Sequence, residues 1–137
     1  MDKRRILLVD NNEIIRLFFK DVFWMHGLDN RFQLEFATNL EEAQTYITNN
    51  ELRPDIIFLD LVMPAVHEGG RGTSVEAGFS FLESIKRNPL CAGVQIIIFS
   101  SEKSPELETH AKSLGAMMYL KKGENLPQDL VAVIEKL

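Results

Sequence analysis

The run Ile56–Leu59, which ends on Asp60, constrains the fold of this chain more than any other stretch. It is too short for a membrane span and too continuous for an amphipathic helix, so it predicts a strand buried on both faces. Such strands belong to parallel sheets, which bind ligands beyond the carboxyl ends of their strands. Taken alone, Asp60 fits a turn residue or a helix cap better than a ligand-binding residue, so its role has to be judged from the rest of the sequence.

The composition is that of one folded domain. The 137 residues are 45% apolar and 26% charged, which suits a single domain over 1–137 with no output domain after it. The net charge of −5 argues against a nucleic-acid partner. Cys91 is the only cysteine, so no internal disulfide is possible, which agrees with a reducing compartment. Neither a signal peptide nor a membrane-length apolar run is apparent, so we expect a cytoplasmic protein without a membrane partner.

Strand-like and helix-like segments alternate along the whole chain. Asn11 or Asn12 is expected to cap the first helix, and Asn39 with Glu42 fits a capping box at the second. The alternation predicts an α/β fold, a doubly wound five-stranded parallel sheet with helices on both faces and the flavodoxin-like order 2-1-3-4-5. The predicted strands are Ile6–Val9, Phe32–Phe36, Ile56–Leu59, Val94–Phe99 and Met117–Leu120.

Two further expectations concern packing and one loop. Trp24, Met117 and Met118 are expected to be packing residues. Ala65–Ser74 contains three glycines and no apolar period, so it predicts a mobile loop, longer than an ordinary strand-to-helix connection. The loop would border the predicted ligand edge and contact a partner or control access, and His67 within it is a minor candidate for metal contact.

Reactive or charged side chains follow four of the five predicted strands. They are Asp10, Asp60, Ser100 and Lys122, and parallel strands place all four at one edge of the sheet. Two carboxylates and water suit Mg²⁺, which also takes substrate phosphate as a ligand. Lysine offers a point charge to a phosphate oxygen, and serine offers a hydroxyl donor. The set therefore predicts a site for a divalent cation and a phosphoryl group, in which a carboxylate can be the nucleophile.

With these residues, the chain resembles the receiver domain of two-component response regulators, the CheY-like family, over essentially its whole length. Each matching motif is weak alone, but three occur in the family's order, with a hydroxyl residue after the fourth strand. The motifs are Val9–Arg16 against V-D-D-N-E-I-N-R, Pro54–Pro64 against P-D-x-x-x-x-D-x-x-M-P, and Gly115–Lys122 against G-A-x-x-Y-L-x-K.

The resemblance implies a phosphoacceptor switch. Asp60 would take the phosphoryl group from a phosphohistidine, and Lys122 would pair with the carboxylate and then with the phosphate. Ser100 would bind the phosphoryl group and shift inward, and Tyr119 would be the aromatic residue that follows it. Such a protein catalyses its own phosphotransfer and dephosphorylation, and Glu102 stands where the family tunes hydrolysis. The implied partners are a sensor histidine kinase or histidine phosphotransfer protein and a downstream protein target.

The resemblance also implies an Mg²⁺ site, and here the chain departs from the family. Asp10, Asn11, Asp60 and the backbone carbonyl of Val62 would hold the ion. The second position is usually acidic in the family, and Asn11 offers an oxygen without charge, so we expect weaker Mg²⁺ binding. Gly123 replaces the usual proline after the lysine, which predicts a looser loop.

Two other function classes remain open at this stage. The first is a degenerate receiver that binds a partner without phosphorylation, for which Asn11 is the main support. The second is a flavodoxin-like cofactor binder or a phosphohydrolase on the same fold. An acid after the first strand opposes a flavin phosphate, and Val62 stands where an aspartyl phosphohydrolase would need a second acid.

Overall fold

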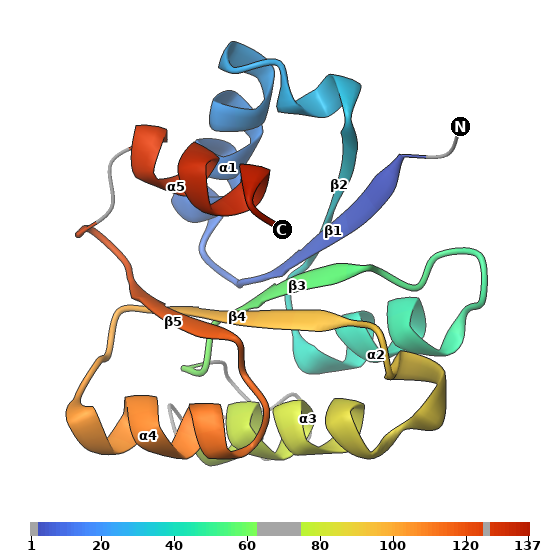
Figure 1. Ribbon diagram of the computed structural model, residues 1–137, viewed down its shortest axis with the longest axis vertical. Helices are drawn as coiled ribbons and strands as arrows, with labels where there is room; N and C mark the ends of the chain where they lie inside the picture. The colour runs from blue at the N-terminus through green and yellow to red at the C-terminus, as the bar shows by residue number, and fades with distance from the viewer. Residues whose placement is uncertain (1–2, 63–74, 125–126) are drawn as a thin grey trace.

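A computed structural model describes residues 3–62, 75–124 and 127–137 of the chain. Strands and helices alternate, and the strands form one parallel sheet in the order β2-β1-β3-β4-β5, which confirms the predicted fold class (Figure 1). The strands are β1 (Arg4–Val9), β2 (Phe32–Ala37), β3 (Ile56–Leu59), β4 (Gln95–Ser100) and β5 (Met118–Lys121). The helices are α1 (Glu13–Met25), α2 (Leu40–Thr48), α3 (Val75–Arg87), α4 (Pro105–Ser113) and α5 (Pro127–Glu135).

The three central strands owe their position to unbroken apolar sequence. Every side chain of β3 is buried, and so are those of Ile6–Val9 in β1 and Ile96–Ser100 in β4. A strand with apolar side chains on both faces must be covered on both faces, and helices supply that cover. The edge strand β2 instead alternates between buried and wetter positions, as its two-residue period predicts.

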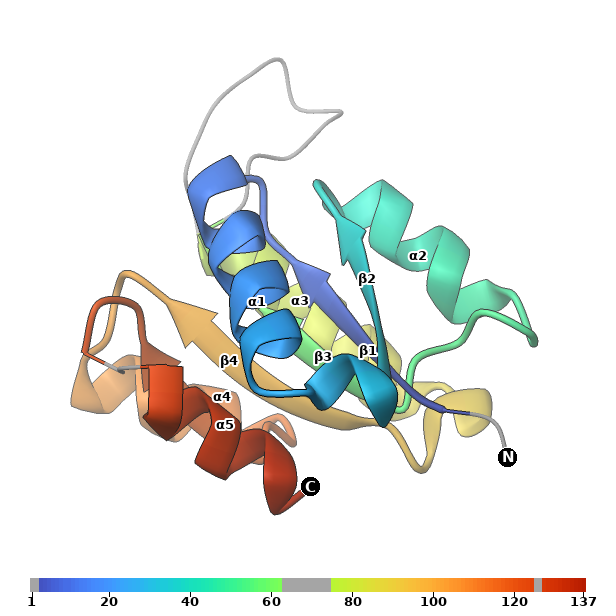
Figure 2. The same ribbon diagram turned by 90° about the horizontal axis from the view of Figure 1, so that it is seen from above.

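The helices form two layers around the sheet. Helices α1 and α5 cover one face, and α2, α3 and α4 cover the other (Figures 1 and 2). The core of the first face is rich in aromatic rings: Phe19 of α1 packs edge-on against Phe58 and Phe99, with ring centroids 5.1 and 5.4 Å apart. Edge-to-face pairs of this kind fix the position of a helix against a sheet. The start of α1 is thereby held near the carboxyl ends of β1 and β3.

Polar side chains determine where several helices begin. The Oδ1 atom of Asn12 accepts hydrogen bonds from the N–H groups of Ile14 and Ile15, so Asn12 is the cap of α1. Asn39 caps α2 by accepting from the N–H of Glu42 at 2.8 Å, as predicted. The Glu42 carboxylate, however, accepts from the backbone and hydroxyl of Thr38 rather than from Asn39, so the capping box is shifted by one residue.

Two predictions about packing are wrong. Trp24 is 73% exposed and Met117 is half exposed, whereas Phe23 beside Trp24 is buried. Phe19, Val22 and Phe23 form the buried stripe of α1, and a helical period places Trp24 on the opposite side of the helix. Met117 lies just before the first residue of β5. The limits of β4 and β5 each lie one residue later than predicted.

Several expectations fall on residues that the structure does not describe. They are the Ala65–Ser74 loop, with His67, and the Met63-Pro64 pair after the central strand. In the described part of the chain, none of the helices has the length and apolar character needed to cross a membrane.

Candidate functional site

The register of the sheet places the predicted site residues at one edge. Val9 of β1 lies beside Leu59 of β3, so the next residues, Asp10 and Asp60, are neighbours across the two central strands. The backbone continues the ladder at this point, because the N–H of Asp60 donates to the carbonyl of Val9 at 3.0 Å. Ser100 ends β4, and the N–H of Lys122 donates to its carbonyl at 2.9 Å. The structure therefore brings Asp10, Asp60 and Lys122 into contact at this edge, and Ser100 ends the neighbouring strand.

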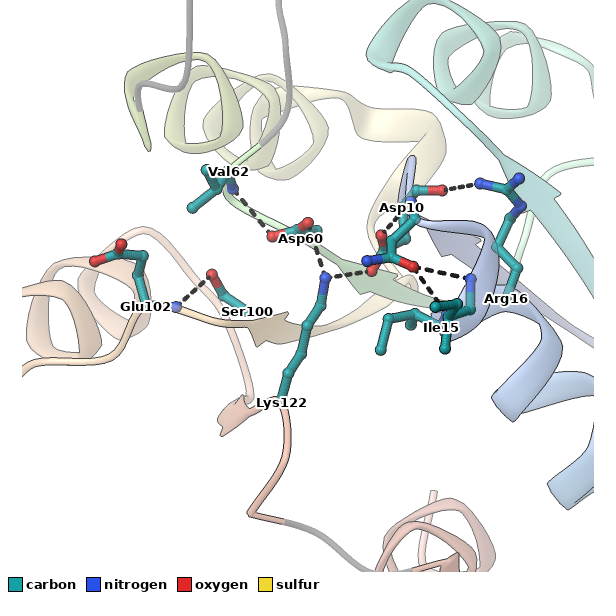
Figure 3. Close-up of polar contacts among 10 residues, drawn as sticks. Asp10, Ile15, Arg16, Asp60, Val62, Ser100, Glu102 and Lys122 are labelled. Atoms are coloured by element: carbon teal, nitrogen blue, oxygen red, sulfur yellow. Dashed lines mark hydrogen bonds and ion pairs between the residues drawn. The ribbon is translucent and has the colours of Figure 1, made fainter.

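The ammonium group of Lys122 lies between the two carboxylates. Its Nζ is 2.6 Å from Oδ2 of Asp10 and 3.0 Å from Oδ2 of Asp60 (Figure 3). Asp10 is fully buried and Asp60 is 4% exposed, so water screens these contacts weakly. Within the described residues Oδ2 of Asp10 accepts no hydrogen bond, and its charge is offset by the ion pair with Lys122. The lysine thus offsets two negative charges at once.

A hydrogen-bond network at the start of α1 fixes Asp10. Its Oδ1 accepts from the N–H of Asn12 at 2.9 Å, and Asn12 in turn caps the helix. One turn further along, the guanidinium of Arg16 donates to the carbonyl of Asp10 at 3.0 Å (Figure 3). The carboxylate is therefore held through both its side chain and its backbone. Of the two predicted capping residues, Asn11 and Asn12, it is Asn12 that caps α1, whereas nothing in the sequence indicates the contact between Arg16 and Asp10.

Asp60 is held by β3 and by the turn after it. Its Oδ1 accepts from the N–H of Val62 at 3.1 Å, while Oδ2 accepts from Lys122. Burial raises the pKa of the Asp60 carboxyl, the Lys122 ammonium opposes that rise, and the charge of Asp10 adds to it. An acid whose charged form is disfavoured by burial is a candidate for chemistry in which that charge is neutralised.

Ser100 and Tyr119 lie together beneath the loop that follows β4. Both side chains are buried, and Oγ of Ser100 accepts from the N–H of Glu102 at 3.3 Å. The phenol of Tyr119 donates to the backbone carbonyl of Glu102, and burial raises its pKa. Loop, hydroxyl and ring are thus directly linked, and the Glu102 side chain points to solvent.

The comparisons with known proteins identify the family. The model of the response regulator receiver domain matches residues 6–135. The chain belongs to the response regulator receiver domain family. The gliding motility regulatory protein of Myxococcus xanthus is 32% identical over 133 residues, which are 97% of this chain and 15% of that protein. This receiver therefore spans a small part of that curated relative.

Solved structures support the same fold. Chemotaxis protein CheY4 of Vibrio cholerae is 24% identical, with a TM-score of 0.76 and 98% of each chain covered. The Mn²⁺-bound form of response regulator Rcp1 is 21% identical, with a TM-score of 0.70 over 97% of this chain and 90% of that one. At these identities the likeness establishes the architecture of the receiver.

The oxygen atoms at the edge suit a hard cation, although the described residues contain no cluster of three or more histidine, cysteine or acidic side chains. Mg²⁺ needs no such cluster in proteins, because it keeps several waters and binds one or two carboxylates. Asp10 and Asp60 supply those carboxylates side by side, and the Val62 backbone follows directly. Asn11 is exposed next to Asp10, so an uncharged oxygen is the most it can add.

The first prediction concerns the stability cost of Asp60. The pKa of the Asp60 carboxyl is raised in the folded receiver. The protonated carboxyl therefore stabilises the folded state at pH values below the unfolded pKa, and this stabilisation is lost as pH rises through the folded pKa. Asp60→Asn should therefore stabilise the receiver at neutral pH, by on the order of 1 kcal/mol, since Lys122 keeps Asp10 as a partner.

Urea denaturation at several pH values measures this difference. The advantage of Asp60→Asn should grow from acid to neutral pH, and Asp55→Asn at the opposite end of β3 is the matched control. A variant that is less stable than the parent at pH 7 would contradict this account of the site.

Proposed function

We propose that this receiver is a two-component signalling switch that accepts a phosphoryl group on Asp60. The observation that carries the proposal is the Asp60 carboxylate, nearly buried at the end of a central strand and paired with Lys122 at 3.0 Å. A purely structural aspartate gains nothing from burial beside a second carboxylate, because like charges at short range raise the free energy of the folded state. Membership of the receiver family supports the same reading.

The chemistry assigns each group a task. One carboxylate oxygen of Asp60 attacks the phosphorus of a phosphohistidine and forms an O–P bond while the P–N bond breaks. The electron pair of that bond passes to the imidazole nitrogen, which then takes a proton from solvent. Lys122 pairs first with the Asp60 carboxylate and then with a phosphoryl oxygen. The buried hydroxyl of Ser100 turns to donate a hydrogen bond to the phosphoryl group.

Asp10, Asp60, the Val62 carbonyl and the Asn11 amide oxygen are the proposed ligands of Mg²⁺. When bound, the ion supplies the positive charge that lets two carboxylates and a phosphoryl group share one pocket. Asp10 suits this role because Asn12 and Arg16 fix its side chain and backbone in advance. The Mn²⁺-bound form of a receiver relative supports a divalent cation at this fold.

A surface beside the site suits the phosphohistidine-bearing partner. Ile14 and Leu17, on the first two turns of α1, are 75% and 50% exposed. Helix α1 begins three residues after Asp10, so these exposed apolar side chains lie on the helix that starts beside the site. A histidine kinase or phosphotransfer protein that brings its phosphohistidine to Asp60 would cover them, and their burial would favour the complex.

Ser100 and Tyr119 form the proposed link from phosphorylation to partner binding. The phosphoryl group gives Ser100 a charged acceptor, which is a stronger one than a neutral carbonyl. Movement of Ser100 would disturb the loop that holds the Tyr119 hydroxyl through Glu102. A phosphoryl group that favours one arrangement of this loop then changes the affinity for a downstream protein.

The second prediction tests the phosphoacceptor. Incubation with acetyl phosphate and Mg²⁺ should add the mass of one phosphoryl group to the parent and to Asp55→Asn, measured by intact mass spectrometry. Asp60→Asn should remain unlabelled, because an amide cannot form the acyl phosphate. Labelling of Asp60→Asn to the extent of the parent would refute the assignment. A parent that stays unlabelled would favour a receiver that binds its partner without phosphorylation.

The third prediction tests the switch. Full phosphorylation should shift the ring resonances of Tyr119 in NMR spectra, because the loop that accepts its hydrogen bond rearranges. The only other tyrosine, Tyr46 on α2, is an internal control and should not move. Ser100→Ala should reduce the Tyr119 shift while Asp60 is still labelled. An unshifted Tyr119 ring in fully phosphorylated protein would rule out the coupling.

A further inference from the structure

Gly78 in α3 lies against the backbone of the residue that follows the proposed phosphoacceptor. A Cβ atom at this position would be 2.8 Å from both Cα and the carbonyl oxygen of Leu61, and 3.0 Å from its Cδ2. Its helical conformation does not itself require glycine, since its φ is not positive. The need for glycine therefore comes from the close approach of helix and chain.

Leu61 lies between Asp60 and Val62, the residue whose N–H holds the Asp60 carboxylate. Leu61 is fully buried, and the N–H of Val62 donates to Oδ1 of Asp60 at 3.1 Å. A displacement of the Leu61 backbone therefore changes the position of the donor, the acceptor, or both. The Val62 carbonyl, a proposed Mg²⁺ ligand, would move with them.

The added methyl group could displace either the helix or the strand end, and packing decides between them. Helix α3 is anchored by Phe79, Leu82 and Ile85, which are buried in the core beneath the sheet. Leu61 lies beyond β3, which ends at Leu59, so no strand ladder holds its backbone. The softer element is thus the Leu61–Val62 segment, and the displacement falls on the site.

We propose that Gly78 is a positioning residue, through which α3 sets the place of Leu61 and hence the geometry of Asp60 and Val62. This inference rests on the proposed phosphorylation of Asp60. Ordinary contacts of a Cβ begin at 3.4 Å, so relief of the 2.8 Å contacts requires a shift of about 0.6 Å. A shift of 1 Å in a reacting group can slow a reaction by about a hundredfold, so a loss of about tenfold is expected here.

The test compares Gly78→Ala with Gly93→Ala, a matched control because a Cβ at Gly93 meets no atom within 4 Å. Labelling by acetyl phosphate and Mg²⁺ should be about tenfold slower in Gly78→Ala and within twofold of the parent in Gly93→Ala. Circular dichroism establishes that both variants are folded. A labelling rate in Gly78→Ala within twofold of the parent would overturn the proposal.

A second readout is independent of phosphorylation. Without any phosphodonor, the NMR resonances of the Val62 amide and the Asp60 carboxyl carbon should shift in Gly78→Ala and stay in place in Gly93→Ala. Unmoved resonances would overturn the positioning role even if the parent takes no phosphate, whereas an unlabelled parent refutes the proposed function alone. The two failures are therefore distinguishable.

The double variant Leu61→Ala/Gly78→Ala, compared with both single variants at a temperature where all are folded, separates displacement of the Leu61 backbone from a clash with its side chain. Loss of the Leu61 side chain removes the 3.0 Å contact, whereas the two 2.8 Å contacts to its backbone persist. Slow labelling in the folded double variant, compared with Leu61→Ala alone, supports displacement of the backbone. Equal rates in these two proteins would show that Gly78 only makes room for a side chain, and would overturn the proposal.

Discussion

The ion pairs of Lys122 with Asp10 and Asp60 are the interaction on which this structure depends. Two carboxylates at the ends of adjacent buried strands repel one another, and little water is present to weaken the repulsion. A single ammonium at 2.6 and 3.0 Å from their oxygens offsets both charges. It comes from the end of β5, so the offset exists only when the sheet has reached its full order and the strand ends have converged.

The elements around Asp10, Asp60 and Lys122 hold these side chains in place. The capped start of α1 holds Asp10, the turn after β3 holds Asp60, and α3 fixes that turn through Gly78. On the other side, the backbone of Glu102 in the loop after β4 donates to the Ser100 hydroxyl and accepts from the Tyr119 hydroxyl. The contacts on the first side suit the proposed phosphoacceptor, which must stay in place, and the loop on the second side suits the proposed response to a new charge.

Much of this arrangement follows from local sequence. Apolar runs that end in Asp10, Asp60 and Ser100 predict parallel strands, and a parallel sheet brings its strand ends together. The family resemblance implied the roles that are proposed for Lys122 and Tyr119. Individual contacts were not predictable. Nothing near Gly78 in the sequence indicates that Leu61 lies against it, and nothing near Arg16 indicates its hydrogen bond to the carbonyl of Asp10. The exposure of Trp24 follows from the helical period, which places it opposite Phe19, Val22 and Phe23; the prediction of a packed Trp24 rested on residue type alone.

The central claim is that the Lys122 ammonium favours the charged form of the Asp60 carboxylate and opposes the rise in pKa that burial causes. The direct measurement is a pH titration of the Asp60 carboxyl carbon by NMR in the parent and in Lys122→Met, which keeps the length and loses the charge. Removal of the ammonium should raise the Asp60 pKa further, because burial and Asp10 then act unopposed. An Asp60 pKa that is unchanged or lower in Lys122→Met would contradict the account.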